Sequence, residues 1–179
     1  IKCGGSDTTS GMASNCVIGY VADKLVDLGA TVIFGETTEF IGGEHLLARR
    51  AVSKEVGDKI LKIVDDMELR AKSLGCDMRK GQPTPGNIEG GLSSIEEKSL
   101  GAIMKSGSKP IQGVLGYTER VTDQKGLWIK DTPGREPEIL TGMAATGAQV
   151  MMFSTGRGAP QGFPSMPVIK ICGNPNTYE

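Results

Sequence analysis

Short apolar runs alternate with longer amphipathic segments along this chain of 179 residues. Strands are predicted at residues 1–3, 31–34, 111–116, 127–130, 149–153 and 168–172, where apolar and β-branched residues cluster. Between several of these runs, apolar residues recur every three to four positions, which predicts amphipathic helices. The alternation indicates one α/β domain over residues 1–179, with a mostly parallel sheet covered by helices on both faces.

Three helices are predicted outside the central part of the chain. The first covers residues 14–28 and places Val17, Val21, Leu25 and Leu28 on its apolar face. The others cover residues 53–74 and the glycine-interrupted segment 136–147. The apolar stripe of the helix at 53–74 comprises Val56, Ile60, Ile63, Val64, Met67, Ala71 and Leu74.

The central stretch, residues 82–107, combines a rigid loop with a capped helix. Pro83 and Pro85 predict a non-helical loop, because proline fixes its own φ and disfavours helix at the preceding residue. Ser93 and Glu96 have the spacing of a capping box, and Gly107 is placed to end the helix. The apolar stripe of this helix comprises Leu92, Ile95, Ser99, Ala102 and Ile103. Glu96 falls inside that stripe, so it is either a cap partner or a catalytic or ligand carboxylate.

Composition narrows the possible partners. The net charge is −1 with basic and acidic residues interspersed, which argues against nucleic-acid and membrane partners. No apolar run is long enough for a membrane span and no signal peptide is visible, so a cytoplasmic protein is expected. The four cysteines lack CxxC spacing and are expected to be reduced thiols. The 26 glycines are about twice the number that average usage predicts, as in loops that approach ligands.

Several motifs, in order, resemble the altronate/galactarate dehydratase family. They are CGGSD at 3–7, GETTE at 35–39, EHLLARRA at 44–51, the long pattern from PTPGN to KSG at 83–107, DTPG at 131–134 and STGRG at 154–158. The resemblance implies a variant Rossmann-like C-terminal catalytic domain of a longer dehydratase. It also implies a sugar-acid substrate, further domains or a small subunit of the same enzyme, and a homo-oligomer.

The loops at the carboxyl ends of parallel strands are where ligands bind in such sheets. The glycine-rich turn after the first strand could bind an anion with its backbone N–H groups, although Ser6 and Asp7 could equally be ordinary caps. The expected substrate-binding residues are Cys3, Gly4, Gly5, Ser6, Asp7, Asn87, Thr155 and Gly156.

A second turn gathers the carboxylates of Glu36, Glu39 and Glu44 with His45. These four side chains could bind a divalent metal, and the oxygen-rich set with one imidazole suits Fe²⁺, with Mn²⁺ and Mg²⁺ as alternatives. The other interpretation is that Glu44 caps a helix, the remaining acids are solvated and the histidine is structural. The family resemblance favours the metal.

Arg157 lies between two glycines, directly after a predicted strand. Its guanidinium could hold a substrate carboxylate by two bonds, or it could pair with a nearby acid such as Asp131. Lys98 borders the face of the central helix that carries Glu96. The expected catalytic residues are therefore His45, Glu96, Lys98 and Arg157.

These groups suit dehydration of a sugar acid to a 2-keto-3-deoxy product. A base removes the proton next to the carboxylate and the β-hydroxyl leaves, while cations or a metal stabilise the aci-carboxylate intermediate. One alternative is elimination of sulfite, as in a sulfolactate sulfo-lyase. Another is a non-catalytic ligand-binding or assembly domain.

Overall fold

The fold is an α/β domain built on parallel strands. The computed structural model describes every residue except Gly4, Thr122 and Glu179. The strands are β1 (Lys2–Cys3), β2 (Thr31–Phe34), β3 (Ile111–Leu115), β4 (Gly126–Lys130), β5 (Met151–Ser154) and β6 (Val168–Ile171). They form two three-stranded sheets with the orders β1-β5-β6 and β2-β4-β3, and every pair is parallel. The predicted α/β class with a parallel sheet is confirmed.

The two sheets meet edge to edge at β1 and β2. The backbone N–H of Gly35 donates to the carbonyl of Ile1 at 3.3 Å, across the gap between the two edge strands. The strands therefore follow the spatial order β3-β4-β2-β1-β5-β6, in which β1 has β2 on one side and β5 on the other. The chain leaves β1 toward β2 and returns later as β5, so β1 is a topological switch point, where ligands bind in open α/β sheets.

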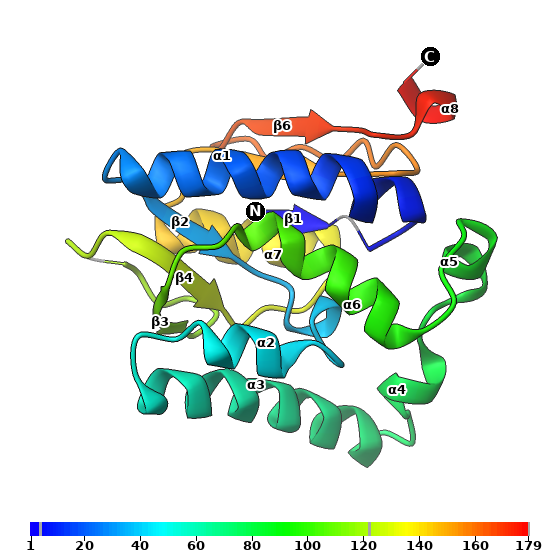
Figure 1. Ribbon diagram of the computed structural model, residues 1–179, viewed down its shortest axis with the longest axis horizontal. Helices are drawn as coiled ribbons and strands as arrows, with labels where there is room; N and C mark the ends of the chain where they lie inside the picture. The colour runs from blue at the N-terminus through cyan, green and yellow to red at the C-terminus, as the bar shows by residue number, and fades with distance from the viewer. Residues whose placement is uncertain (4, 122, 179) are drawn as a thin grey trace.

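Helices lie on both sides of the strands (Figure 1). The α-helices are α1 (Asn15–Asp27), α2 (Glu44–Arg49), α3 (Lys54–Ser73), α4 (Met78–Gly81), α5 (Pro85–Glu89), α6 (Ile95–Ile103), α7 (Glu136–Thr146) and α8 (Pro175–Tyr178). A π-helix, η1 (Ser10–Ser14), and two 3₁₀ turns, η2 (Thr37–Glu39) and η3 (Met104–Ser106), complete the elements. In the described part of the chain, no helix is long and apolar enough to cross a membrane.

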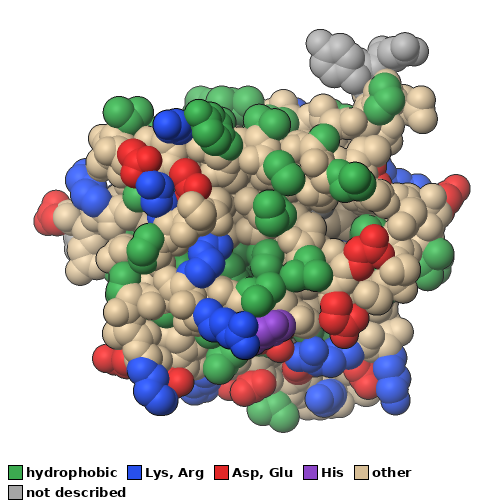
Figure 2. Space-filling view, viewed as in Figure 1, with side chains coloured by type: hydrophobic (Ala, Val, Ile, Leu, Met, Phe, Trp, Pro, Cys, Tyr) green, Lys and Arg blue, Asp and Glu red, His purple; other side chains and the backbone are tan. Residues whose placement is uncertain are grey.

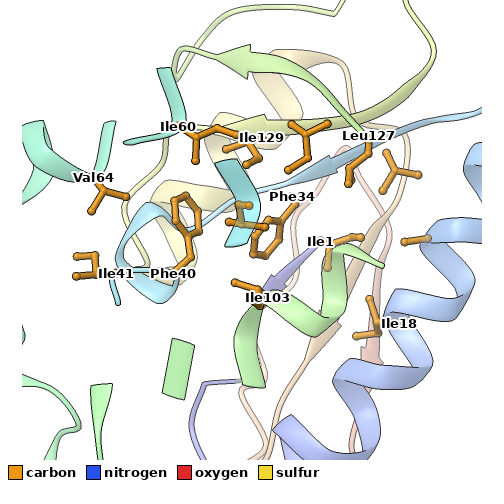
Figure 3. Close-up of a cluster of buried hydrophobic side chains, with 14 of the residues drawn as sticks. Ile1, Ile18, Phe34, Phe40, Ile41, Ile60, Val64, Ile103, Leu127 and Ile129 are labelled. Atoms are coloured by element: carbon orange, nitrogen blue, oxygen red, sulfur yellow. The ribbon is translucent and has the colours of Figure 1, made fainter. Parts of the chain in front are cut away.

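The alternation of side chains along β2 explains the two covered faces. Val32 and Phe34 belong to the larger buried cluster, which also receives residues of α1, α3 and α6 (Figure 3). Ile33 points the other way and packs against the cluster formed by Ile139, Leu140 and Met143 of α7. Because successive strand residues face opposite sides, one short apolar run supports both layers of helices.

The long helix α3 is confirmed. It begins after Ser53, whose hydroxyl accepts from the backbone N–H of Val56 at 3.3 Å, as an N-cap does. Its predicted stripe faces the core at Ile60 and Val64, both fully buried. Leu74 lies just past the helix end and is exposed.

The predicted apolar face of α1 is wrong except at Leu25, which packs against the core. Val17 is 56% exposed and Leu28 is 84% exposed, whereas Ile18, Gly19 and Ala22 are buried. A side chain on Gly19 would overlap the carbonyl oxygen of Met104, so small residues let α1 approach η3 closely. The buried face therefore carries smaller residues than the face that hydrophobicity alone selects.

Two predictions for the central stretch also need correction. Pro85 starts α5 instead of belonging to a continuous loop, because Thr84 and Asn87 form a capping box and proline is tolerated in the first turn. The N-cap of α6 is Ser94, which accepts from the N–H of Glu97 at 3.1 Å, one residue after the predicted cap. The carboxylate of Glu97 accepts from the backbone N–H of Ser93 at 2.7 Å, so the predicted Ser93–Glu96 box does not form.

The structure also places Glu96 outside the core. The predicted stripe Leu92, Ile95, Ser99, Ala102 and Ile103 is buried as expected. Glu96 is exposed, however, while Lys98 is buried on the inner side of α6. Gly107 follows η3 with a positive φ of 65°, in agreement with the predicted helix end.

Candidate active site

The loops that follow β1 and β5 meet at the switch point. Cys3 and Ser154 are paired in register as the last residues of these two strands, so both loops leave the sheet at the same edge. The backbone N–H of Gly156 donates to the hydroxyl of Ser6 at 3.2 Å. The carboxylate of Asp7 lies directly against Gly156, where a Cβ would overlap it. The structure therefore brings these predicted substrate-binding residues together.

Some residues of these loops already have structural partners. Asp7 accepts from the hydroxyl of Thr9 at 2.5 Å and from the backbone N–H of Ser10 at 3.2 Å. Thr155 accepts from the backbone N–H of Gly158 at 3.0 Å. Asp7 and Thr155 therefore shape the loops, which is the capping alternative predicted for Asp7. The predicted site residue Gly4 lies outside the described residues.

Lys98 links α6 to the loop after β1. Its ammonium lies 2.7 Å from Oε1 of Gln82, 3.2 Å from Oδ1 of Asn87 and 3.5 Å from Oε1 of Glu39. Asn87 in turn donates from Nδ2 to the carbonyl of Ser6 at 3.1 Å. The predicted residues Asn87 and Lys98 thus belong to one polar network around the loop.

A network of buried ion pairs lies beneath the loop after β1, and the sequence did not predict it. The carboxylate of Glu36 lies 3.4 Å from Lys2 through Oε1 and 3.4 Å from Lys105 through Oε2. All three side chains are buried. Lys105 also donates to the carbonyl of Cys3, and Glu36 accepts from the backbone N–H of Cys3. Two buried cations therefore lie directly under the start of the glycine-rich loop.

The backbone is strained where these groups meet. Cys3 and Glu36 are non-glycine residues with positive φ, at 61° and 72°. Such conformations cost about 1–3 kcal/mol each and persist only when surrounding contacts enforce them. The bonds from Lys105 and Glu36 to the Cys3 backbone supply those contacts.

Charge and burial set the protonation of this region. Burial raises the pKa of the Cys3 thiol to about 11, and the nearby Glu36 carboxylate adds to the effect. Cys3 is therefore a neutral thiol near pH 7, not a thiolate nucleophile. Burial alone would lower the pKa of Lys2, but the charges of Glu36 and Glu136 outweigh it and raise the pKa above its ordinary value. Lys2 therefore remains a cation, whose ammonium lies 4.3 Å from the ring centroid of Phe153.

Arg157 lies at the rim of the site. Its side chain is 61% exposed, and Nη2 is 3.6 Å from the carboxylate of Glu89, a weak surface pair. The guanidinium lies over Gly86 of α5, where a side chain would displace it. Asp131, the partner considered from sequence, instead accepts from the hydroxyl of Thr37 at 2.6 Å. Arg157 therefore keeps most of its donors available.

The predicted metal ligands are not brought together. Glu36 is held by two lysines, Glu39 pairs with Lys98, and Glu44 accepts from Arg79 at 3.0 Å. His45 is exposed at the start of α2. Among the described residues, no group of three or more His, Cys, Asp or Glu side chains could hold a metal ion. The four residues therefore do not fit the metal site predicted from their proximity in sequence.

The DTPG and GETTE motifs instead hold each other. The hydroxyl of Thr132 accepts from the backbone N–H of Glu36 at 2.7 Å, and the hydroxyl of Thr37 accepts from the N–H of Thr132 at 3.2 Å. These bonds join the loops after β2 and β4 and fix the position of Glu36 beneath the site. The motifs have a positioning role that their spacing alone does not reveal.

A groove of about 590 Å³ opens beside this site, between the loop after β1, η1 and α6. Its polar lining includes Asp7, Lys98 and the exposed Glu96. Its apolar lining includes Met12, Leu92, Leu100 and Met104. Figure 2 shows hydrophobic side chains gathered on this side of the molecule. Glu96 is therefore accessible from the groove, although it is not the buried carboxylate predicted.

Sequence reasoning missed the roles of Lys2 and Lys105. Lys105 follows Lys98 by seven positions, which is two helical turns, so the two lysines share the inner side of α6 and η3. That spacing was a usable signal for Lys105. Lys2 and Glu36 come from two strand ends about 30 residues apart, and only the pairing of strands brings them together.

Comparisons with known proteins identify the family of this chain. Residues 1–179 match the family described as D-galactarate/Altronate dehydratase, C-terminal. The chain is 44% identical over 178 residues to the (2R)-sulfolactate sulfo-lyase subunit beta of Chromohalobacter salexigens, covering 98% of this chain and 46% of that protein. It is 42% identical to the galactarate dehydratase (L-threo-forming) of Escherichia coli, covering 96% of this chain and 32% of that enzyme.

A third relative is the altronate dehydratase of Bacillus subtilis, which is 37% identical and is matched by 100% of this chain over 35% of its own length. The chain thus spans less than half of each of these relatives. The match to the family extends over all 179 residues, including the loops that meet after β1 and β5. The chain belongs to the D-galactarate/altronate dehydratase family and corresponds to its C-terminal domain.

Proposed function

We propose that this chain is the catalytic domain of a lyase that dehydrates a sugar acid such as galactarate or altronate. The observation that carries this proposal is the meeting of the β1 and β5 loops at the switch point, with Lys98 and Glu39 beside Gly5. The names of two relatives, galactarate dehydratase and altronate dehydratase, supply the reaction class.

The reaction removes a proton and a hydroxyl from adjacent carbons. A base takes the proton from the carbon next to the carboxylate, and the electron pair of that C–H bond forms a carbon–carbon double bond. The bond from the β-carbon to its hydroxyl then breaks, and the oxygen leaves as water after it accepts a proton. The resulting enol becomes the 2-keto-3-deoxy acid.

The difficult step is the negative charge that develops on the substrate carboxylate. Lys98 at the loop, which pairs with Glu39, is the buried cation nearest to the bound substrate, whereas the ammonium groups of Lys2 and Lys105 lie beneath the loop and pair with Glu36. Fixed charges in a buried site stabilise developing charge better than water does, because they need no reorganisation. Arg157 at the rim is placed to bind a terminal carboxylate of the substrate with its planar fork.

Elimination of sulfite from sulfolactate is the second candidate. It is favoured by the 44% identity to the sulfo-lyase subunit beta, against 42% for the galactarate dehydratase. Both reactions start from a 2-hydroxy acid and lose a group from the β-carbon, so they need the same base and the same stabilised intermediate. The leaving group is the difference: sulfite departs with the electron pair of its C–S bond.

A divalent metal, with Fe²⁺ first and Mn²⁺ or Mg²⁺ as alternatives, stays a prediction for the complete enzyme. The set Glu36, Glu39, Glu44 and His45 does not fit it. No step above is therefore assigned to a metal. Further domains or a second subunit, and assembly into a homo-oligomer, are likewise proposals.

The proposal is tested with the complete enzyme and three substrates: galactarate, altronate and sulfolactate. We expect a 2-keto-3-deoxy product from a sugar acid, with sulfolactate turned over at least 100-fold less efficiently. Release of sulfite as the preferred reaction would establish the second candidate. Tight binding of these acids without any turnover would support a ligand-binding domain and contradict both lyase assignments.

A further inference from the structure

The carboxylate of Glu39 has one oxygen that no described group of the protein satisfies. Oε1 pairs with Lys98 at 3.5 Å, whereas Oε2 is buried and has no hydrogen-bond partner among the described residues. A buried charged oxygen without a donor costs about 1–3 kcal/mol or more, so such an atom requires an explanation.

Lys98 cannot supply the missing donor. An ammonium has three N–H groups, and those of Lys98 face three acceptors on Gln82, Asn87 and Glu39. Lys98 is itself buried, so its position is fixed by these contacts and by α6. The lysine thus holds Oε1 and forms no hydrogen bond to Oε2.

The free oxygen points at the glycine-rich loop. A Cβ on Gly5 would overlap Oε2 of Glu39, and it would also come within 3.0 Å of the Lys98 side chain. Gly5 and Lys98 both line the groove beside α6, and the free oxygen is buried directly behind Gly5. The carboxylate of Glu39 can lie against residue 5 only because Gly5 has no side chain.

We propose that Glu39 is the general base of the elimination, with Oε2 receiving the proton from the carbon next to the substrate carboxylate and Lys98 as its positioning residue. This assignment rests on the proposed lyase function. Glu39 then transfers a proton instead of binding a metal. In this step the C–H bond breaks, its electrons form the double bond, and the proton ends on Oε2. The same proton can then be given to the departing oxygen or to solvent.

The test compares Glu39→Gln, Glu39→Asp and Lys98→Met in the complete enzyme, with Glu55→Gln as the control. Glu55 is an exposed acid of α3 in a surface pair with Lys59. Turnover and exchange of the substrate α-proton in D₂O are measured against pH. We expect Glu39→Gln to lower kcat and proton exchange by about 10²- to 10⁴-fold, the range for a lost general base. KM should stay within threefold.

The other variants separate catalysis from structure. Glu39→Asp keeps a carboxylate and should recover part of the lost rate, and Lys98→Met, which removes the group that holds Oε1, should lower kcat while KM stays within threefold. If the wild-type enzyme is active and the kcat of Glu39→Gln lies within threefold of the wild-type value, the base assignment is overturned and the lyase function stands. A shared loss in Glu39→Gln and Glu39→Asp, with unchanged proton exchange, would also overturn it. A wild-type enzyme that eliminates neither water nor sulfite would overturn the function and the assignment together.

Discussion

The ammonium of Lys105 lies 3.4 Å from Oε2 of Glu36, and both side chains are buried. Lys105 comes from the turn after α6 and Glu36 from the turn after β2, so this pair ties a helix of one layer to the sheet. It also holds the backbone of Cys3, where the candidate site begins. The geometry of the loop after β1 therefore depends on a buried ion pair.

Replacing Lys105 with Met should destabilise the protein strongly. The variant removes one of the two cations around Glu36, and a buried charge that loses a partner costs about 3–5 kcal/mol. We expect about 3 kcal/mol, because Lys2 remains, and the free energy of unfolding in urea measures it. Lys54→Met, which removes a fully solvated i,i+4 pair with Asp58, should change stability little. Equal stability of the two variants would show that the buried pair is not needed for folding.

Another buried lysine, Lys130, should make stability depend on pH. Lys130, at the end of β4, donates to the carbonyl of Gly116 at 3.0 Å and to the hydroxyl of Thr146. Burial lowers the pKa of Lys130 from 10.5 to about 8. Between these two values the unfolded chain binds more protons than the folded one, so folding should become more favourable as pH rises.

The matched comparison is wild type against Lys130→Met. The free energy of unfolding of the wild type, relative to this variant, should rise by up to about 3 kcal/mol between pH 8 and pH 10.5. Unfolding curves collected at several pH values measure this difference. Parallel pH dependence of the two proteins would mean that Lys130 titrates normally.

Removing the imidazole of His45 should leave the chemistry intact. His45 is exposed and belongs to no described group that could hold a metal. We therefore expect His45→Ala to keep the metal content and kcat of the complete enzyme within twofold of wild type, with stability changed by less than about 0.5 kcal/mol. Metal analysis and turnover check this. Loss of metal together with activity would restore the ligand role predicted from sequence.

Arg157→Lys should weaken binding of the transition state. Lysine offers one point charge and cannot copy the two parallel bonds of a guanidinium to a carboxylate. The expected loss is about 1.5–3 kcal/mol, or roughly a 10- to 150-fold drop in kcat/KM. Glu89→Gln, which removes the weak surface partner of Arg157, should have little effect. If both variants lose activity equally, the arginine acts through Glu89 instead of through substrate.

Much of the fold was predictable because its signals are local. The run at residues 31–34 is strand β2 with the predicted bounds, and the stripe of α3 follows from helical spacing alone. The face of α1 was missed because Gly19 and Ala22 pack through their small size, which hydrophobicity does not detect. The cap of α6 was displaced by one residue because Ser93 and Ser94 are chemically equivalent candidates.

The site was predictable only in part. Ser6, Asn87, Lys98 and Gly156 were expected there, and the structure brings them together. The pairing of Glu36 with Lys2 and Lys105 depends on which strands and helices become neighbours, and sequence spacing does not contain that information. The acidic crowding around residue 39 indicated a metal site. In the structure, each of those acids instead faces a different cation.

The most direct test of the site at the β1–β5 junction is kcat/KM of Gly156→Ala, compared with Gly162→Ala, in the complete enzyme. A Cβ on Gly156 would overlap the carboxylate of Asp7 and push the two loops apart, whereas nothing lies within 4 Å of a Cβ on Gly162. Thermal unfolding of both variants confirms that they fold. We predict at least a 100-fold loss of kcat/KM for Gly156→Ala and a change within twofold for Gly162→Ala. Folded variants with equal, near wild-type kcat/KM would contradict an active site at this junction.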